Sequence, residues 1–340
     1  MSHTCKPSRT SRAWRVLKRS VLVGGRTGLK TSFDLLIVMV PVIVIMTVLE
    51  ALGALKLIEG VFAPVMELMG LPGNSALVFI SGMAINLYTA VAVAANVALT
   101  MKQMTVIAVL CQVCHNLPVE CAVQKKAGTG VLWMLVVRFV TGILGALALS
   151  WIIPETGAWA AVVSRTNSVE TLGTWELIGS RAATNGVFLV KIVGIVMALM
   201  IAMELLRETG ALKVITVLMR PLTWLAGLPK QAGFTVMTST TLGLAYGAGT
   251  VIAEARAGHL SREEQFRTNV FIGTTHSLFE DVALFAVIGA SLVWMVVSRL
   301  VIGAVAVRLF AVARWALCRR ARPPAPADAH DSEDSPDKTG

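Results

Sequence analysis

The stretch His276–Asp281 reads His-Ser-Leu-Phe-Glu-Asp and places three ionisable side chains inside a long apolar run. A second stretch of the same kind, His115–Glu120, reads His-Asn-Leu-Pro-Val-Glu and also lies between apolar segments. In both stretches an acidic residue follows the histidine by five positions. An ionisable residue at membrane depth is costly and by default marks a functional site. The repeated His–acid stretch is therefore the pattern on which we base the fold.

The composition is that of a membrane protein. The 340 residues are 55% hydrophobic and 15% charged, with a mean hydropathy of +0.72, whereas soluble domains are about 45–50% apolar and roughly 25% charged. About 20 apolar residues cross the roughly 30 Å hydrocarbon core of a bilayer. Runs of about this length occur at 33–49, 131–153, 186–203 and 282–297. We predict an all-α polytopic membrane protein.

The membrane region is an internal duplication. Residues 53–56 (Gly-Ala-Leu-Lys) recur at 210–213, and residues 70–72 (Gly-Leu-Pro) recur at 227–229, both 157 positions later. Further matching pairs follow in the same order: Tyr88 and Tyr246, His115 and His276, Trp133 and Trp294, and Arg138 and Arg299. Chance does not readily align such distinctive residues in one order. Duplicated halves with a binding site at their interface are a recurring plan of transporters.

The duplication and the charges divide the chain. We expect a basic cytoplasmic N-terminal segment (1–30), a first membrane repeat (31–153) whose first span covers 33–56, and a polar connector (154–185). A second membrane repeat (186–312) and a basic, then acidic, disordered tail (313–340) follow. The net charge of +10 is concentrated near the two ends. The positive-inside rule then predicts a bacterial inner-membrane protein with both termini in the cytoplasm.

The relative orientation of the halves depends on the first motif. If His115–Glu120 is broken or re-entrant, each half has three spans and the halves are inverted. If this segment crosses fully, each half has four spans and the halves are parallel. The inverted arrangement puts one set of basic residues in the cytoplasm, which favours it: Lys102, Lys125, Lys126, Arg207, Lys213, Arg220 and Lys230. Arg256, Arg262 and Arg267 count against it.

Both motifs are expected to converge on one site. Pro118 disfavours a continuous helix in the first copy, whereas in a continuous helix His276 and Glu280 would share a face, with Asp281 one step round. The alternative is that each His–acid pair is a local structural contact. Paired polar residues in the preceding spans extend the predicted substrate site. Its full membership is His115, Asn116, Glu120, His276, Ser277, Glu280, Asp281, Tyr88, Tyr246, Asn96, Glu254 and Asn86.

Imidazole with carboxylate also suits a divalent metal such as Fe, Zn or Mn. The candidate ligands are His115, Glu120, His276 and Asp281. No cofactor is otherwise predicted, and a divalent metal or a coupling ion stays open. Arg138 and Arg299 would either extend toward the interface from a helix end or pair with Glu120 or Asp281.

The two apolar halves, with Gly70–Pro72, Asn86–Tyr88 and the His–acid motifs, resemble the gate, or nucleoside-recognition-domain, family of bacterial membrane proteins, which includes spore-maturation-type proteins. The resemblance covers roughly residues 35–150 and 186–305. Related domains form the membrane cores of ferrous-iron and concentrative nucleoside transporters. The resemblance implies a solute or ion pathway, but this chain lacks the soluble GTPase domain of full iron transporters.

The sequence therefore predicts a transport protein, not an enzyme, that moves a small polar solute or ion through a site between two gate-type repeats. One alternative is a divalent metal-ion carrier or channel, and another is a non-transporting membrane assembly factor. The expected partners are the lipid bilayer and a small-molecule or ion substrate, without nucleic acid. A homo-oligomer or a membrane partner stays open.

Overall fold

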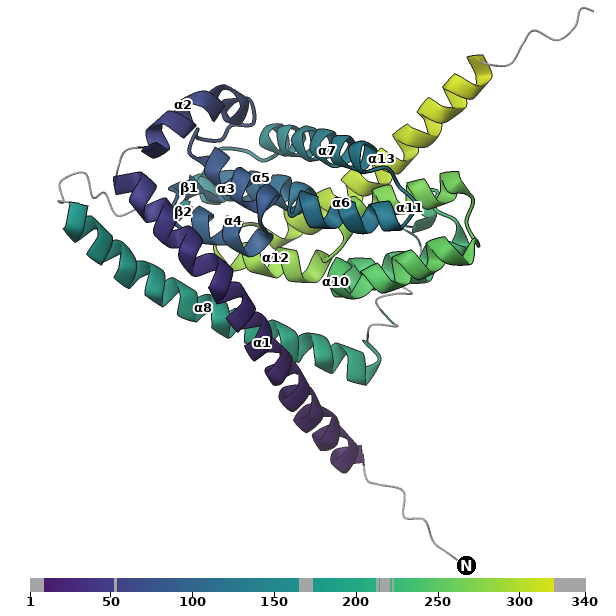
Figure 1. Cartoon of the computed structure of the whole chain (residues 1–340), viewed down its shortest axis with the longest axis horizontal. Helices are drawn as coiled ribbons and strands as arrows, with labels where there is room; N and C mark the ends of the chain where they lie inside the picture. Colours follow the sequence, from purple (N-terminus) through teal and green to yellow (C-terminus); the bar gives the residue numbers. More distant parts are fainter. Residues whose placement is uncertain are drawn as a thin grey trace, which may run out of the picture.

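The computed structural model describes residues 9–51, 54–164, 174–211, 214, 221 and 223–320. The described chain is almost entirely helical (Figure 1), which confirms the all-α prediction. Its one small sheet pairs β1 (Leu99–Thr100) antiparallel with β2 (Val162–Ser164). Tyr246 has no described side chain, and Lys213 and Arg220 lie outside the described residues.

Each repeat consists of one long outer helix followed by shorter, broken helices. The first repeat contains α1 (Arg9–Ala51), α2 (Ala54–Glu67), α3 (Ser75–Ala84), α4 (Leu87–Ala94), α5 (Met101–Cys114), α6 (Leu117–Lys126) and α7 (Val131–Ile152). The turn η1 (Gly157–Ala160) precedes β2. The second repeat contains α8 (Thr174–Thr209), η2 (Lys230–Ala232), α10 (Gly233–Ala257), α11 (Arg262–Thr275), α12 (Leu278–Val287) and α13 (Leu292–Arg320).

The inner helices of the two repeats begin with the same local signal. The Thr100 hydroxyl accepts a hydrogen bond from the Gln103 backbone N–H at 3.2 Å, and the Gln103 side chain accepts one from the Thr100 N–H at 3.1 Å. Ser261 and Glu264 form the same reciprocal pair at the start of α11. Such a capping box satisfies backbone donors that the first helical turn leaves free. It fixes where α5 and α11 begin.

Six helical segments are long and apolar enough to cross a membrane, three in each repeat, counted over the described residues. In Figure 1, α5 and α6 run from left to right, whereas α11 and α12 run from right to left. The equivalent inner helices therefore run in opposite directions, as the inverted arrangement requires.

The basic residues do not all lie where we expected. The ends of α6 and α11 meet, because the side-chain amide of Gln124 donates to the Asn269 carbonyl and Asn269 donates to the Ala127 carbonyl. Lys125 and Lys126 of α6 therefore share one end of the molecule with the start of α11. Lys102 lies at the opposite end of α5, so the prediction that it shares their side is wrong.

Lys102 donates to Glu155 at 2.8 Å. This hydrogen bond lowers the pKa of the Glu155 carboxyl. The ion pair therefore forms above the usual titration range of a glutamate and is lost as the pH falls through the lowered pKa.

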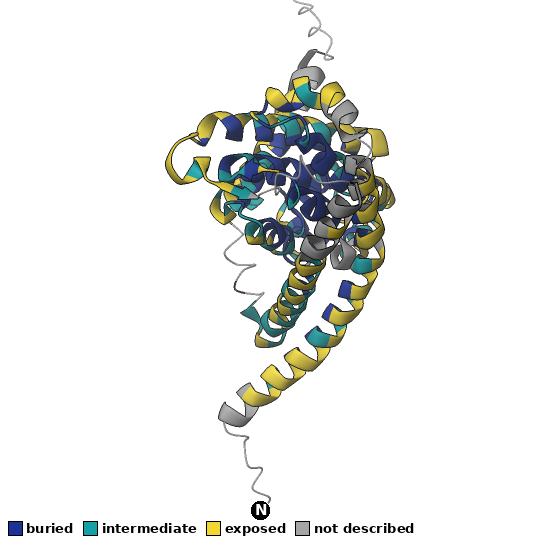
Figure 2. Cartoon of the chain, turned by 90° about the vertical axis from the view of Figure 1, so that its left-hand side faces the viewer, coloured by how far each residue is buried: buried dark blue, intermediate teal, exposed yellow. Residues whose placement is uncertain are grey.

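The inner helices form the core and the outer helices cover it. Figure 2 shows buried ribbon at the centre and exposed ribbon along the outer helices. The run Val106–Leu110 of α5 is fully buried, whereas Val190 of α8 is 73% exposed. Exposed apolar side chains on α1, α7, α8 and α13 suit a lipid-facing surface, because lipid is itself apolar.

The outermost layer is the crossed pair α1 and α8 (Figure 1). Arg19 of α1 and Glu208 of α8 form an ion pair at 3.2 Å. The helix α1 starts at Arg9, so it begins well before the first span that we expected at 33–56.

Candidate functional site

Both His–acid motifs lie at a break between two helices. His115 directly follows the last residue of α5 and has an extended backbone, and Asn116 adopts φ 46°, ψ 39°. His276 and Ser277 repeat this geometry between α11 and α12, with Ser277 at φ 51°, ψ 31°. Residues other than glycine seldom adopt this left-handed backbone conformation. The surrounding structure therefore holds both turns in place.

Each turn donates a backbone hydrogen bond to a preceding helix of its own repeat. The Asn116 N–H donates to the Gly82 carbonyl of α3 at 2.9 Å, and the Ser277 N–H donates to the Ser239 carbonyl of α10 at 3.1 Å. The helix breaks at Ser277, so His276 and Glu280 do not share the face of one continuous helix. Of the two acidic residues in this motif, Asp281, the counterpart of Glu120, has a carboxylate oxygen within 4.8 Å of a ring nitrogen of His276.

A buried arginine joins each turn to its acidic residue. Arg138 of α7 is 0% exposed and donates to the Val113 carbonyl at 2.7 Å and the His115 carbonyl at 3.0 Å. A third nitrogen of this guanidinium lies 2.5 Å from Glu120 Oε2. The last carbonyls of a helix have no partner within it, and the planar guanidinium satisfies two of them together with a carboxylate.

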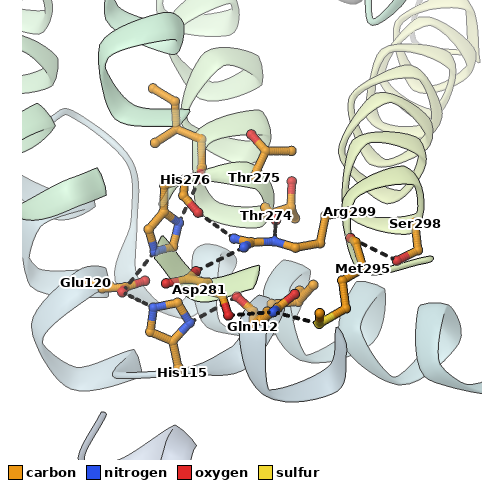
Figure 3. A network of polar contacts seen from close by, with 12 residues as sticks. Gln112, His115, Glu120, Thr274, Thr275, His276, Asp281, Met295, Ser298 and Arg299 are labelled. Atoms are coloured by element: carbon orange, nitrogen blue, oxygen red, sulfur yellow. Dashed lines mark hydrogen bonds and ion pairs between the residues drawn. The ribbon is translucent and has the colours of Figure 1, made fainter. Parts of the chain in front are cut away.

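Arg299 of α13 makes the same three contacts in the second repeat. It donates to the Thr274 carbonyl at 3.1 Å and the His276 carbonyl at 2.5 Å, and its Nη1 lies 2.9 Å from Asp281 Oδ2 (Figure 3). The two arginines therefore form ion pairs within the site. They belong to the site, although our predicted membership omits them. Their matching positions in the duplicated sequence were the signal that could have placed them there.

The two repeats meet at one carboxylate oxygen. Glu120 Oε1 lies 3.0 Å from Nε2 of His115 and 3.0 Å from Nε2 of His276 (Figure 3). The two imidazole rings are 5.0 Å apart between centroids. Since Arg138 holds the other oxygen of Glu120, this carboxylate links three side chains from both halves of the molecule.

The hydrogen-bond partners of the two histidines show which ring nitrogen carries the proton. His115 Nδ1 lies 3.0 Å from the Gln112 carbonyl, and His276 Nδ1 lies 2.9 Å from the Ile272 carbonyl. A carbonyl only accepts hydrogen bonds, so each Nδ1 carries the ring proton. In the neutral rings both Nε2 atoms then present lone pairs to Glu120 Oε1, which is also an acceptor. The cluster is complete only with a positive species, a proton or a cation, between these atoms.

Glu280 points out of this cluster. The Tyr88 hydroxyl of α4 donates to Glu280 Oε1 at 2.5 Å, so this contact also joins the two repeats. Glu280 lines a cavity of about 210 Å³ together with Thr27 of α1 and with Glu204 and Arg207 of α8. The cavity therefore reaches the residue next to Asp281.

The remaining predicted residues have local contacts. Asn86 caps α4 by accepting from the Thr89 N–H at 2.9 Å. Asn96, in the turn after α4, donates to the Ala92 carbonyl of that helix, and Glu254 lies 3.2 Å from His259 near the end of α10. The side chain of Tyr246 lies outside the described residues. The described contacts of Asn96 and Glu254 thus give no link to the cluster, and their role in a pathway stays a prediction.

Gln112 is a site residue that the sequence analysis missed. It is fully buried, and its amide nitrogen donates to the Asp281 backbone carbonyl at 3.0 Å (Figure 3). Gln112 thus links α5 of the first repeat to α12 of the second. It lies in an apolar helix without a matching polar residue in the other copy, since Gly273 stands at the equivalent position.

The family model described as nucleoside recognition, named Gate, matches residues 32–122 and 189–309. The chain belongs to the Gate family. The two matched segments fall in the two repeats, and each includes one His–acid motif. This Gate protein is also 28% identical over 277 residues to the uncharacterized membrane protein YvoD of Bacillus subtilis (strain 168), an alignment that covers 80% of this chain and 88% of YvoD. No solved structure matches the chain.

Proposed function

We propose that this Gate protein is a membrane transport protein that recognises a small polar solute or ion in the cluster between its two repeats. The observation that carries the proposal is the contact of Glu120 with a histidine from each repeat. A site shared by two inverted repeats suits alternating access, in which one repeat moves against the other around a fixed site. Family membership and the membrane-spanning helices support a transport role.

The broken helices support the same proposal. Non-helical backbone at membrane depth is tolerated only when it is buried in protein or lines a water-filled cavity. Here both breaks expose the first turn of a following helix, and Glu120 and Asp281 lie in these first turns. The partial positive charge at a helix N-terminus favours carboxylates there. The two helix breaks thus position two acidic side chains, Glu120 and Asp281.

The cavity beside Glu280 supports an entry route. It is bounded by α1 and α8, the outermost helices, and by Glu280 next to Asp281. A solute that enters between α1 and α8 would meet Glu280 and Tyr88 before it reaches the cluster. We assign Glu280 to the route and Glu120 to the recognition site.

Flux into liposomes that contain the purified protein tests the proposal. The probes are tritiated uridine and adenosine, which the family description indicates, and radiolabelled Zn²⁺ and Mn²⁺. We expect uptake of at least one probe above protein-free liposomes, and we expect Glu120→Gln to abolish it because the substitution removes the shared charge. The control Glu155→Gln changes an exposed glutamate in an ion pair outside the cluster and should leave uptake unchanged. Uptake that is insensitive to Glu120→Gln would reject the proposed site, and no uptake of any probe would favour a membrane assembly role.

A further inference from the structure

The donor atoms of the cluster have the spacing of a metal site. One nitrogen each of His115 and His276 and one carboxylate oxygen of Asp281 lie within 4.8 Å of one another. Glu120 Oε1 lies 3.0 Å from both imidazole nitrogens. Two ligands bound at about 2.0–2.1 Å to one tetrahedral ion are about 3.3 Å apart. Around an ion, the two contacts of Glu120 Oε1 would lengthen slightly, and the donor atoms of His115, His276 and Asp281 would draw closer together.

The surroundings orient these atoms as they do in metal sites. A histidine that binds a metal almost always donates its other ring N–H to a carbonyl or a carboxylate, which fixes the tautomer and directs the free lone pair. Both His115 and His276 make this bond through Nδ1. Arg138 and Arg299 each hold one oxygen of an acidic residue, Glu120 and Asp281, which leaves the other oxygen of each free to bind.

The ligand types select the class of ion. Two imidazoles with two carboxylates suit Zn, Fe, Co or Mn, whereas Ca²⁺ and Mg²⁺ prefer shells of oxygen ligands. An ion with two neutral imidazole ligands also resolves the contact between acceptor atoms at Glu120 Oε1. We infer that the cluster binds a divalent transition-metal ion through His115 and His276 with Glu120 and Asp281. This inference rests on the proposed function and names the substrate class of the same site.

Cobalt binding to the purified protein in detergent tests the inference without a transport assay. We expect Co²⁺ to give the visible absorption bands of a low-coordinate site and Zn²⁺ to displace it. His276→Gln removes one ligand but keeps a polar side chain, and it should weaken binding by at least about tenfold. The matched control is His259→Gln, because His259 is an exposed histidine that also lies beside a glutamate. It should bind Co²⁺ as the wild type does.

Co²⁺ binding and solute uptake are measured independently, so the metal site and the transport function can fail separately. If folded wild-type protein gives no Co²⁺ bands, or if His276→Gln binds as tightly as His259→Gln, the metal site is rejected. Uptake of a nucleoside that depends on Glu120 would then still support transport of an organic solute. Should His276→Gln fail to give a monodisperse helical protein, His115→Gln provides the second ligand variant, with the same expected loss. Metal binding without any flux would support the site and reject transport.

Discussion

At the scale of single residues, the two arginines organise the site. Arg138 and Arg299 each satisfy two carbonyls at a helix end and pair with one acidic side chain, all without solvent exposure. Water cannot replace these bonds in a buried position, so loss of a guanidinium leaves both carbonyls and the carboxylate unsatisfied. The arginines therefore stabilise both helix breaks and hold the two acidic side chains in position.

We expect Arg138→Met to destabilise the protein strongly. Removing one partner of a buried ion pair costs about 3–5 kcal/mol, because the other charge is left uncompensated. The measurement is unfolding of the purified protein by heat and by denaturant in detergent. Arg308→Met is the control, since Arg308 also donates to a backbone carbonyl, that of Leu225, but lies at the surface. Equal stability of the two variants would contradict the capping role of Arg138.

At the scale of helices, the duplication accounts for most of what the sequence could predict. The repeated His–acid stretches predict two equivalent turns that meet, and the structure brings them together at Glu120. The break at Ser277 was not predictable from local sequence, because the second copy lacks the proline of the first. It depends on the Ser239 carbonyl, a partner that only the folded chain supplies. The spacing of five positions after each histidine did identify Asp281 as the counterpart of Glu120.

Arg299 is positioned by the close packing of α13 on α11. A Cβ atom added at Gly303 would lie 2.7 Å from the Thr275 side chain and 2.9 Å from that of Thr274. We expect Gly303→Ala to force the two helices apart and to destabilise the protein by about 1–3 kcal/mol. The same unfolding measurement, together with Co²⁺ binding, checks this expectation.

Gly194→Ala provides the comparison for Gly303→Ala. Gly194 is a helical glycine of α8 with open space around the position of an added Cβ. Alanine favours helix over glycine by up to about 1 kcal/mol, so Gly194→Ala should be neutral or slightly stabilising. If both substitutions behave alike, helix propensity rather than contact between α11 and α13 governs the effect at Gly303.

At the scale of the whole molecule, the opposite directions of the inner helices give the protein two distinct ends. Lys125 and Lys126 share one end with the start of α11, where Arg256 and Arg262 flank the loop between α10 and α11. The other end carries β1, β2 and the pair of Lys102 with Glu155. The accumulation of basic residues at the first end predicts that it faces the cytoplasm. Arg256 and Arg262, which counted against an inverted arrangement in the sequence, thus lie at the same end as Lys125 and Lys126 and agree with it.

Cysteine labelling in cells checks this orientation. In a background in which Cys5 and Cys318 are serine, we expect Thr156→Cys to react with a membrane-impermeant maleimide from outside and His259→Cys to react only after the cells are opened. Both positions are exposed and lie at opposite ends of the molecule. The native Cys111, Cys114 and Cys121 are buried, so the parent protein serves as the unlabelled control. Labelling of both variants from the same side would refute the orientation.

Because both histidines contact the same oxygen of Glu120, the duplicated chain has one such cluster rather than two. Two copies of a half-molecule would be expected to give two sites, but both histidines face the same acceptor atom. We therefore expect one ligand per polypeptide at the proposed site, because neither half supplies both histidines. A substitution in either copy of the motif therefore changes the same cluster, to which both halves contribute.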